Sequence, residues 1–241
     1  MASSTPQLYC LNKNYSTWSL RGWVAMRALN IDFETVMLTV GGPGVPDMGT
    51  PAADALMMRA GPTGKTPALH VQKPGSSGEK HIIFESLAIM EYLAEDYPSL
   101  WPADRFERAY ARSLAAEMAT SFEALRNYSM NIRKTYPFDP ELYNANVEKN
   151  ILRLSSIWEE LRSKAVAKDN DEGFLFGSFT ALDAMYAPIM FRLRGFSLKD
   201  KLQGKLAAAY VDHMLNFEAM REWEESSSLE TEWVKRNEVY N

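Results

Sequence analysis

The chain has 241 residues, of which 46% are hydrophobic and 24% are charged, a composition typical of a globular protein with a full core. Its net charge of −5 and its pI near 5.4 argue against nucleic acid or an anionic membrane surface as the main partner. Its single cysteine, Cys10, excludes an intrachain disulfide, and no apolar run approaches the ~20 residues of a membrane span. The first residues lack the charged and apolar regions of a secretory signal, so we expect a cytoplasmic protein.

The first 97 residues alternate between short apolar runs and segments of helical period. Alternation of apolar residues is typical of a strand, whereas their recurrence at every third or fourth residue is typical of a helix. On this basis we predict strands at 8–11, 33–40, 67–71 and 81–84 and helices at 17–29, 52–59 and 86–97. The stretch 73–80, rich in Gly and Ser, is interpreted as a flexible hairpin loop.

The pattern changes after residue 97, because the segments that follow have helical period and include no convincing strand. These segments are 108–135, 140–168, 180–195 and 205–223. Asp139 followed by Pro140 predicts a helix start, since Asp caps free N–H groups and Pro has none to satisfy. We therefore expect an α/β domain at 1–97, a linker at 98–107 and an all-helical domain at 108–241.

Thr66 and Pro67 stand at the entry to a predicted strand. A proline there cannot donate to the sheet, so it marks an edge or a bend. If the bond between them is cis, the carbonyl and N–H of Thr66 turn outward and are available to a ligand, and a plain turn is the alternative. The stretch 61–66 also resembles a phosphate loop, but that motif needs a glycine where Arg59 stands and a helix after Thr66. We therefore reject nucleotide binding through this loop.

Glu85 and Ser86 stand where a predicted strand turns into a helix. Ser86 fits the N-cap, and a helix N-terminus binds carboxylates through its free N–H groups and its dipole. Glu85 can pair with the ammonium group of a ligand, so a ligand end that carries both charges would satisfy both residues. The alternative is an ordinary capped helix with a solvated Glu. Together with Thr66 and Pro67, these residues predict a small pocket for a peptide-like ligand with a carboxylate.

The order of these motifs resembles that of the glutathione transferases. Its elements are a first strand, a helix that begins with hydroxyl side chains, the stretch Gly64 to Leu69 and the stretch Glu85 to Ile89. The second half of the chain supports the same resemblance, because residues 174–183 resemble the superfamily's C-terminal segment. In that segment Thr180 and Asp183 form a capping box, in which each satisfies a free backbone donor of the other.

The resemblance extends from residue 8 to about residue 223 and implies a thioredoxin-like N-terminal domain followed by an all-helical domain. It also implies a glutathione site on the first domain and a hydrophobic co-substrate site between the two. Within the stretch Lys65, Thr66 and Pro67, the Thr66 backbone would pair with the cysteinyl part of glutathione. Lys65 stands where a basic side chain often approaches the peptide, and Glu85 and Ser86 would hold the γ-glutamyl end.

The residue that activates the thiol should follow the first strand, where the resemblance requires a hydroxyl or a thiol. Ser16 lies five residues before Arg21, as in the serine-type classes, which include the zeta class, so Ser16 is our candidate. Tyr15 is the second candidate, followed by Ser19 and Thr17. Because no cysteine occupies this segment, the cysteine-type classes are disfavoured.

The mechanism that we expect is electrostatic. An ordinary thiol has a pKa of about 8.5, and lowering it by about two units needs about 2.7 kcal/mol of preference for the thiolate. One hydrogen bond to a charged acceptor contributes about 1.5–3 kcal/mol. The Ser16 hydroxyl and the N-terminus of the following helix are therefore sufficient, and no general base is required.

These inferences predict a cytoplasmic glutathione transferase that acts in detoxification, conjugating glutathione to small hydrophobic electrophiles, with a homodimer expected from the family. A glutathione-dependent isomerase or peroxidase is one alternative, and a glutathione- or ligand-binding module of the same fold without turnover is another. Met118, Phe122 and Tyr128 are candidates for the co-substrate site, with a core role as the alternative. Arg59 is a candidate for the glycyl carboxylate of glutathione. The scattered histidines lack metal-ligand spacing, so we expect no metal.

Overall fold

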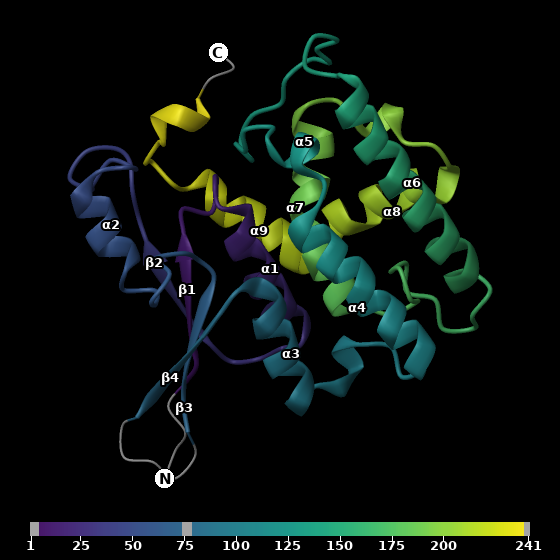
Figure 1. Cartoon of the computed structure of the whole chain (residues 1–241), viewed down its shortest axis with the longest axis horizontal. Coiled ribbons are helices and arrows are strands. Elements are labelled where there is room, and N and C mark those ends of the chain that lie inside the picture. The colour runs from purple at the N-terminus through teal and green to yellow at the C-terminus, as the bar shows by residue number, and fades with distance from the viewer. Residues whose placement is uncertain (1–4, 74–78, 239–241) are drawn as a thin grey trace.

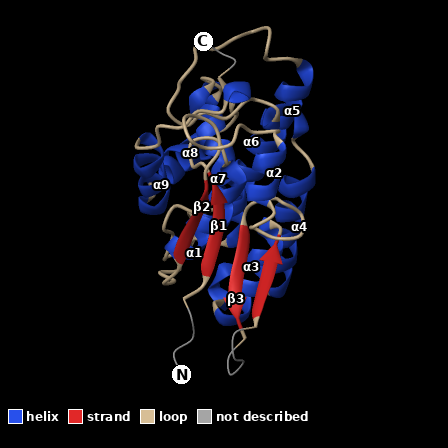
Figure 2. Cartoon of the chain, turned by 90° about the vertical axis from the view of Figure 1, so that its left-hand side faces the viewer, coloured by secondary structure: helices blue, strands red, loops and turns tan. Residues whose placement is uncertain are grey.

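A computed structural model describes residues 5–73 and 79–238 and places the sheet on one side of the molecule and most of the helices on the other (Figure 1). Its four strands are β1 Gln7–Leu11, β2 Glu34–Leu38, β3 Ala68–Gln72 and β4 Lys80–Phe84. They form one sheet in the order β2-β1-β3-β4, in which β1 is parallel to β2 and β3 is antiparallel to β1 and β4. Figure 2 shows the strands side by side in front of the helices.

Three helices belong to the sheet region: α1 Thr17–Ala28, α2 Pro51–Met57 and α3 Ser86–Asp96. α1 packs against β1, and α3 packs against α1, β3 and β4. All seven predicted elements of this region are therefore present, and the thioredoxin-like fold class is confirmed. Most of the predicted hairpin loop, residues 74–78, lies outside the described residues.

Beyond α3, the regular secondary structure of the described chain is mainly helical. Its helices are α4 Arg105–Thr120, α5 Glu123–Arg126, α6 Ala145–Ala165, α7 Ala181–Gly195, α8 Lys205–Asn216 and α9 Glu218–Ser228. Between β4 and residue 238 only isolated bridges near residues 174–178 have strand-like pairing. In the part of the chain that the structure covers, none of the helices has both the length and the apolar character that crossing a membrane requires.

The single helix predicted at 108–135 is wrong. α4 ends at Thr120 because Ser121 is extended with ψ of −164°, and Phe122 then adopts a left-handed backbone with φ of 60°, which a helix of L-residues cannot continue through. The short α5 follows, and the chain from 127 to 144 contains no helix. The helix predicted at 205–223 is likewise divided, because Phe217 is extended with ψ of 134° between α8 and α9.

The predicted helix start at Asp139 and Pro140 is also wrong. The Asp139 carboxylate accepts a hydrogen bond from the N–H of Glu141 at 2.8 Å, and this contact caps only a turn. Asn144 caps α6 instead, because its side-chain oxygen accepts from the N–H groups of Asn146 at 3.0 Å and Val147 at 3.2 Å.

α7 forms the centre of the helical part. It packs against α1, α4 and α8, and all of its residues except Arg194 are buried. The predicted capping box at its start is confirmed, and the Thr180 N–H donates to the Asp183 carboxylate at 2.9 Å. The same buried carboxylate also accepts from the N–H of Leu175 at 3.1 Å and from the Tyr210 hydroxyl at 2.9 Å.

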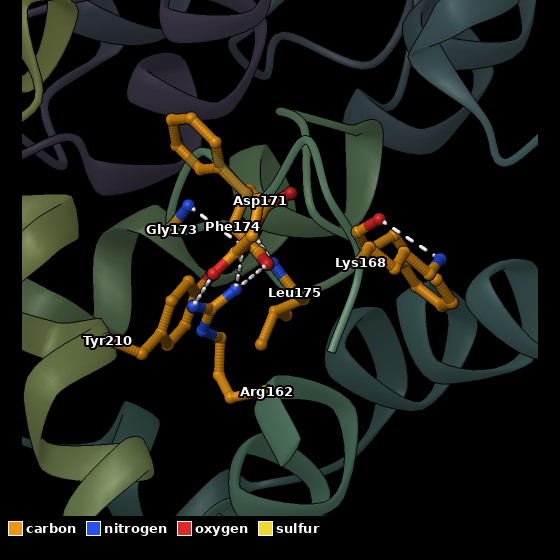
Figure 3. Close-up of polar contacts among 9 residues, drawn as sticks. Arg162, Lys168, Asp171, Gly173, Phe174, Leu175 and Tyr210 are labelled. Atoms are coloured by element: carbon orange, nitrogen blue, oxygen red, sulfur yellow. Dashed lines mark hydrogen bonds and ion pairs between the residues drawn. The ribbon is translucent and has the colours of Figure 1, made fainter. Parts of the chain in front are cut away.

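A loop before α7 is fixed to α6 by an ion pair. Figure 3 shows the Arg162 guanidinium pointing at the Asp171 carboxylate, with two nitrogen–oxygen distances of 2.7 Å. The same guanidinium donates to the carbonyl of Phe174, and the Asp171 carboxylate also accepts from the N–H of Gly173. This bidentate geometry is the strong form of an Arg–carboxylate pair, and it holds the loop that leads to the capping box.

Candidate active site

The end of β1, α2 and the loop before β3 enclose a cavity of about 570 Å³. Ser16, Lys65 and Thr66 line it together with Asp54 and Met57. Ser16 directly precedes α1, so its side chain lies at the positive end of that helix. The structure therefore brings three of the predicted site residues to one cavity.

Pro67 follows Thr66 through a cis peptide bond, which is the condition stated above for a Thr66 backbone that faces a ligand. Arg59 is exposed and does not line this cavity, whereas the neighbouring Met58 does. Lys65 is therefore the basic residue that the structure brings to the cavity wall.

A chain of hydroxyl groups leads to Ser16. The Ser16 and Ser19 hydroxyl oxygens are 2.8 Å apart, and the Ser19 hydroxyl donates to the Thr66 hydroxyl oxygen at 3.0 Å. The N–H of Leu11 also donates to the Ser19 oxygen, at 3.2 Å. Because the one proton of Ser19 is directed to Thr66, the contact between Ser16 and Ser19 uses the proton of Ser16. We name this Thr66–Ser19–Ser16 arrangement the hydroxyl chain.

Tyr15 and Thr17 already have partners elsewhere. The buried Tyr15 hydroxyl donates to the Glu238 carboxylate at 2.5 Å and accepts from the Arg133 guanidinium at 3.1 Å. Burial, together with the Glu238 contact, raises the pKa of Tyr15. The Thr17 hydroxyl is buried and accepts from the Arg192 guanidinium at 3.3 Å. These contacts favour Ser16 over both alternatives.

The segment after α9 returns along the loop that carries Ser16 (Figure 1). The Glu230 carboxylate accepts hydrogen bonds from the N–H groups of Lys13 at 2.6 Å and Asn14 at 3.0 Å. Arg133 donates to the Glu230 carbonyl at 2.6 Å. The backbone just before Ser16 is therefore held by residues that lie far away in the sequence.

Glu85 and Ser86 lie at the start of α3, but the predicted N-cap role of Ser86 is wrong. Ser86 is the first helical residue, and Glu85 occupies the cap position with φ of 70°. Such a backbone at a residue other than glycine costs about 1–3 kcal/mol and persists where the surrounding structure enforces it. Ser86 is buried with its hydroxyl 3.7 Å from the Met185 sulfur, whereas Glu85 is exposed. The free N–H groups of the first turn remain the feature suited to an anion.

A second cavity, of about 480 Å³, lies on the other side of Ser16 and is lined by Tyr15, Trp18, Arg126, Tyr128 and Arg192 among others. The two cavities share Leu11, Ser16 and Trp18. Ligands in both cavities would therefore meet at Ser16.

Of the candidates for the co-substrate site, only Tyr128 lines this second cavity. Met118 is completely buried in the core, and Phe122 lines another cavity, of about 870 Å³, which shares Asn127 and Tyr128 with the second one. Sequence reasoning missed Trp18, Arg126 and Arg192. Of these, only Trp18 could have been found from the sequence, because it lies within the segment of hydroxyl candidates.

The described residues contain no cluster of three or more His, Cys, Asp or Glu side chains that could hold a metal ion.

Residues 15–96 match the family model described as "Glutathione S-transferase, N-terminal domain". A probable maleylacetoacetate isomerase of Caenorhabditis elegans is 28% identical over 129 residues, which are 53% of this chain and 52% of that protein. The match thus spans about half the length of the curated relatives.

Solved structures resemble nearly the whole chain. A glutathione transferase homolog from Burkholderia gl BGR1, with bound glutathione, is 20% identical with a TM-score of 0.62 and covers 93% of this chain and 98% of its own. A maleylacetoacetate isomerase from Anaeromyxobacter dehalogenans 2CP-1, with glutathione in its active site, is 18% identical with a TM-score of 0.59. The match covers 91% of this chain and 94% of the isomerase chain. The mixed sheet followed by helices is thus the glutathione transferase fold. The family match at residues 15–96 and these relatives support the glutathione transferase superfamily.

Proposed function

We propose that this chain is a glutathione-dependent enzyme of serine type, in which the Ser16 hydroxyl holds the glutathione sulfur as a thiolate for attack on a carbon electrophile. The observation that carries the proposal is the position of Ser16 at the start of α1, where two cavities meet. One cavity would take glutathione, and the other would take the electrophile.

In this proposal glutathione lies along Thr66 and the start of α3. The Thr66 backbone, shaped by Pro67, pairs with the cysteinyl part of the peptide. The free N–H groups at Ser86 bind the γ-glutamyl carboxylate, and the exposed Glu85 carboxylate pairs with the γ-glutamyl ammonium. Lys65 lies at the cavity wall, where it favours the negative charge of the peptide.

The chemistry needs only a lowered thiol pKa. A hydrogen bond from Ser16 to the sulfur, at about 1.5–3 kcal/mol, lowers the thiol pKa by about 1–2 units. The N-terminus of α1 adds positive potential at the same position. The thiolate then forms a carbon–sulfur bond to the electrophile, and the leaving group departs with the electron pair of its bond to carbon.

A glutathione-dependent isomerase is the second candidate, because the curated relatives and one of the solved structures are named maleylacetoacetate isomerases. In that reaction the thiolate adds to a conjugated double bond. The resulting single bond rotates, and elimination restores the double bond and frees the glutathione. The same Ser16 contact serves both reactions, so substrate profiling separates them.

The test compares the wild-type protein with Ser16→Ala and with Ser113→Ala, a control hydroxyl on the outer face of α4 that donates to the Ala109 carbonyl. Conjugation of glutathione to chlorodinitrobenzene is measured beside calorimetric glutathione binding. We expect turnover to collapse in Ser16→Ala while binding persists, with Ser113→Ala unchanged. Full activity in Ser16→Ala would refute the assignment and promote Tyr15.

Binding without wild-type turnover would favour the isomerase, the peroxidase or a non-catalytic module. The cytoplasmic location, the homodimer and the domain limits at 97 and 108 remain predictions, which fractionation, sedimentation and limited proteolysis would check.

A further inference from the structure

Three guanidinium groups gather around the indole of Trp18. The distances from the ring centroid to the guanidinium carbons are 4.7 Å for Arg21, 5.4 Å for Arg126 and 5.9 Å for Arg192. The three arginines come from α1, α5 and α7, so the fold itself assembles this group. We call it the arginine cluster.

No carboxylate is paired with the arginine cluster among the described residues. Arg192 donates to the carbonyls of Tyr128 and Arg126, each at 3.3 Å, and Arg126 donates to the Ala119 carbonyl at 2.8 Å. Arg21 donates through Nε to the Met185 carbonyl at 3.0 Å. Within the described chain, the two terminal nitrogens of Arg21 and Nε of Arg126 have no hydrogen-bond partner.

Such an arrangement is unusual, because charged groups that leave water are normally paired. Arg21 is 1% exposed and Arg192 is 4% exposed. Burial, with the neighbouring arginines, lowers the pKa of Arg21 to about 9 and that of Arg192 to about 10. Both groups therefore stay charged at neutral pH. The negative charge of the exposed Glu85 carboxylate acts in the opposite direction and raises the pKa of Arg21. Glu85 and Arg21 form no ion pair in the described structure.

The arginine cluster borders the place where chemistry is proposed. Arg126 and Arg192 line the 480 Å³ cavity together with Ser16 and Trp18. A planar, apolar ligand body suits the Trp18 ring, and a carboxylate suits the planar fork of an arginine. One small molecule could therefore satisfy the ring and the positive charge while its reactive carbon faces Ser16.

We propose that the co-substrate of this chain carries a carboxylate that binds Arg126 and Arg192 beside Trp18, with its electrophilic carbon directed at the glutathione sulfur. The proposal rests on the proposed function and refines the hydrophobic electrophile expected from sequence to an anionic one. In the competing interpretation, Arg192 has only a structural role and binds no ligand. Its hydrogen bonds then serve to hold residues 126–128 against α1 and α7.

The first test uses chlorodinitrobenzoate and its methyl ester, which share the ring and the leaving group and differ in charge. Because the ester group also activates the ring more strongly than the carboxylate does, each kcat/KM is divided by the rate constant of the uncatalysed reaction with glutathione before the two are compared. In conjugation the thiolate forms the carbon–sulfur bond and chloride leaves with its electron pair. We expect wild-type kcat/KM to favour the acid by about tenfold or more, and Arg126→Gln to reduce this ratio by about tenfold. Arg112→Gln, at an exposed arginine paired with Glu91 on the outer face of α4, should leave the ratio unchanged. Equal turnover of acid and ester by the wild type would overturn the proposal, as would an unchanged ratio in Arg126→Gln.

The second test needs no turnover and therefore separates this proposal from the proposed function. Calorimetry compares dinitrobenzoate with dinitrobenzamide, which lack a leaving group, on the glutathione-saturated wild-type protein. Tighter binding of the benzoate, lost in Arg126→Gln, is expected even if no electrophile is conjugated. Equal binding of benzoate and benzamide by the wild type would refute the carboxylate site, and this holds even if the variant fails to fold.

Discussion

The hydroxyl chain predicts that Ser19 acts on the thiol through Ser16. In the ligand-free chain the Ser16 proton faces Ser19 and the Ser19 proton faces Thr66. When a thiolate arrives, the Ser16 proton can turn to the sulfur and the Ser19 proton to the Ser16 oxygen, because either of these two oxygens can be the donor. The hydrogen bond between the two serines is then kept with Ser19 as its donor, and this donor polarises the Ser16 hydroxyl.

Ser19→Ala removes the donor to Ser16 from that complex. A neutral hydrogen bond contributes about 0.5–1.5 kcal/mol, which corresponds to a rise of about 0.4–1 unit in the pKa of the bound thiol. Ser16→Ala loses the charged hydrogen bond itself and should raise the pKa by about 1–2 units. Ser19→Ala also leaves the half-buried N–H of Leu11 without its partner, which costs about 1 kcal/mol of folding stability.

The assay is a pH titration of glutathione-saturated protein, followed by the ultraviolet absorbance of the thiolate and checked against the pH dependence of kcat/KM. Ser113→Ala is the matched control, because its hydroxyl donates only to the carbonyl one helical turn earlier. A thiol pKa that stays constant or falls in a folded, glutathione-binding Ser19→Ala protein would refute the reasoning. A purely structural Ser19 would lower the melting temperature without moving this pKa.

Two further predictions concern binding and stability. Glu85→Ala or Ser86→Ala should weaken calorimetric glutathione binding, and unchanged affinity in both would contradict the placement of the γ-glutamyl end at α3. Asp183→Ala should lower the free energy of unfolding by about 3 kcal/mol or more, because it leaves the buried N–H groups of Leu175 and Thr180 and the Tyr210 hydroxyl without an acceptor. Urea denaturation measures this loss, and a decrease below about 1 kcal/mol would show that water replaces the carboxylate.

The sheet region was predictable because its elements have strong local signals. β1 and α1 show clear apolar patterns, and the cis bond before Pro67 lies where a strand-initiating proline indicates a bend. The capping box at Thr180 was predictable for the same reason, since both partners lie within one helical turn.

The errors arose where tertiary contacts decide the backbone. Nothing in the apolar period of 108–135 indicates that Phe122 adopts a left-handed conformation that ends the helical path. Asp139 and Asn144 are both good caps, and only packing selects Asn144 for α6.

The arginine cluster lay beyond sequence reasoning for a related reason. Arg126 and Arg192 are 66 residues apart, and only the packed fold brings them to one ring. A local pattern could have indicated Arg21 and Trp18 as neighbours on one helix, but not the two other charges around the ring.

The contacts of Glu230 have a consequence for the order in which this site forms during synthesis. The loop before Ser16 leaves the ribosome well before the carboxylate that holds its backbone, which lies 217 residues later. A nascent chain can pair its four strands while this loop is still unrestrained. The proposed site is therefore completed late, and a protein shortened to the matched residues 15–96 would lack the contacts that fix the loop before Ser16.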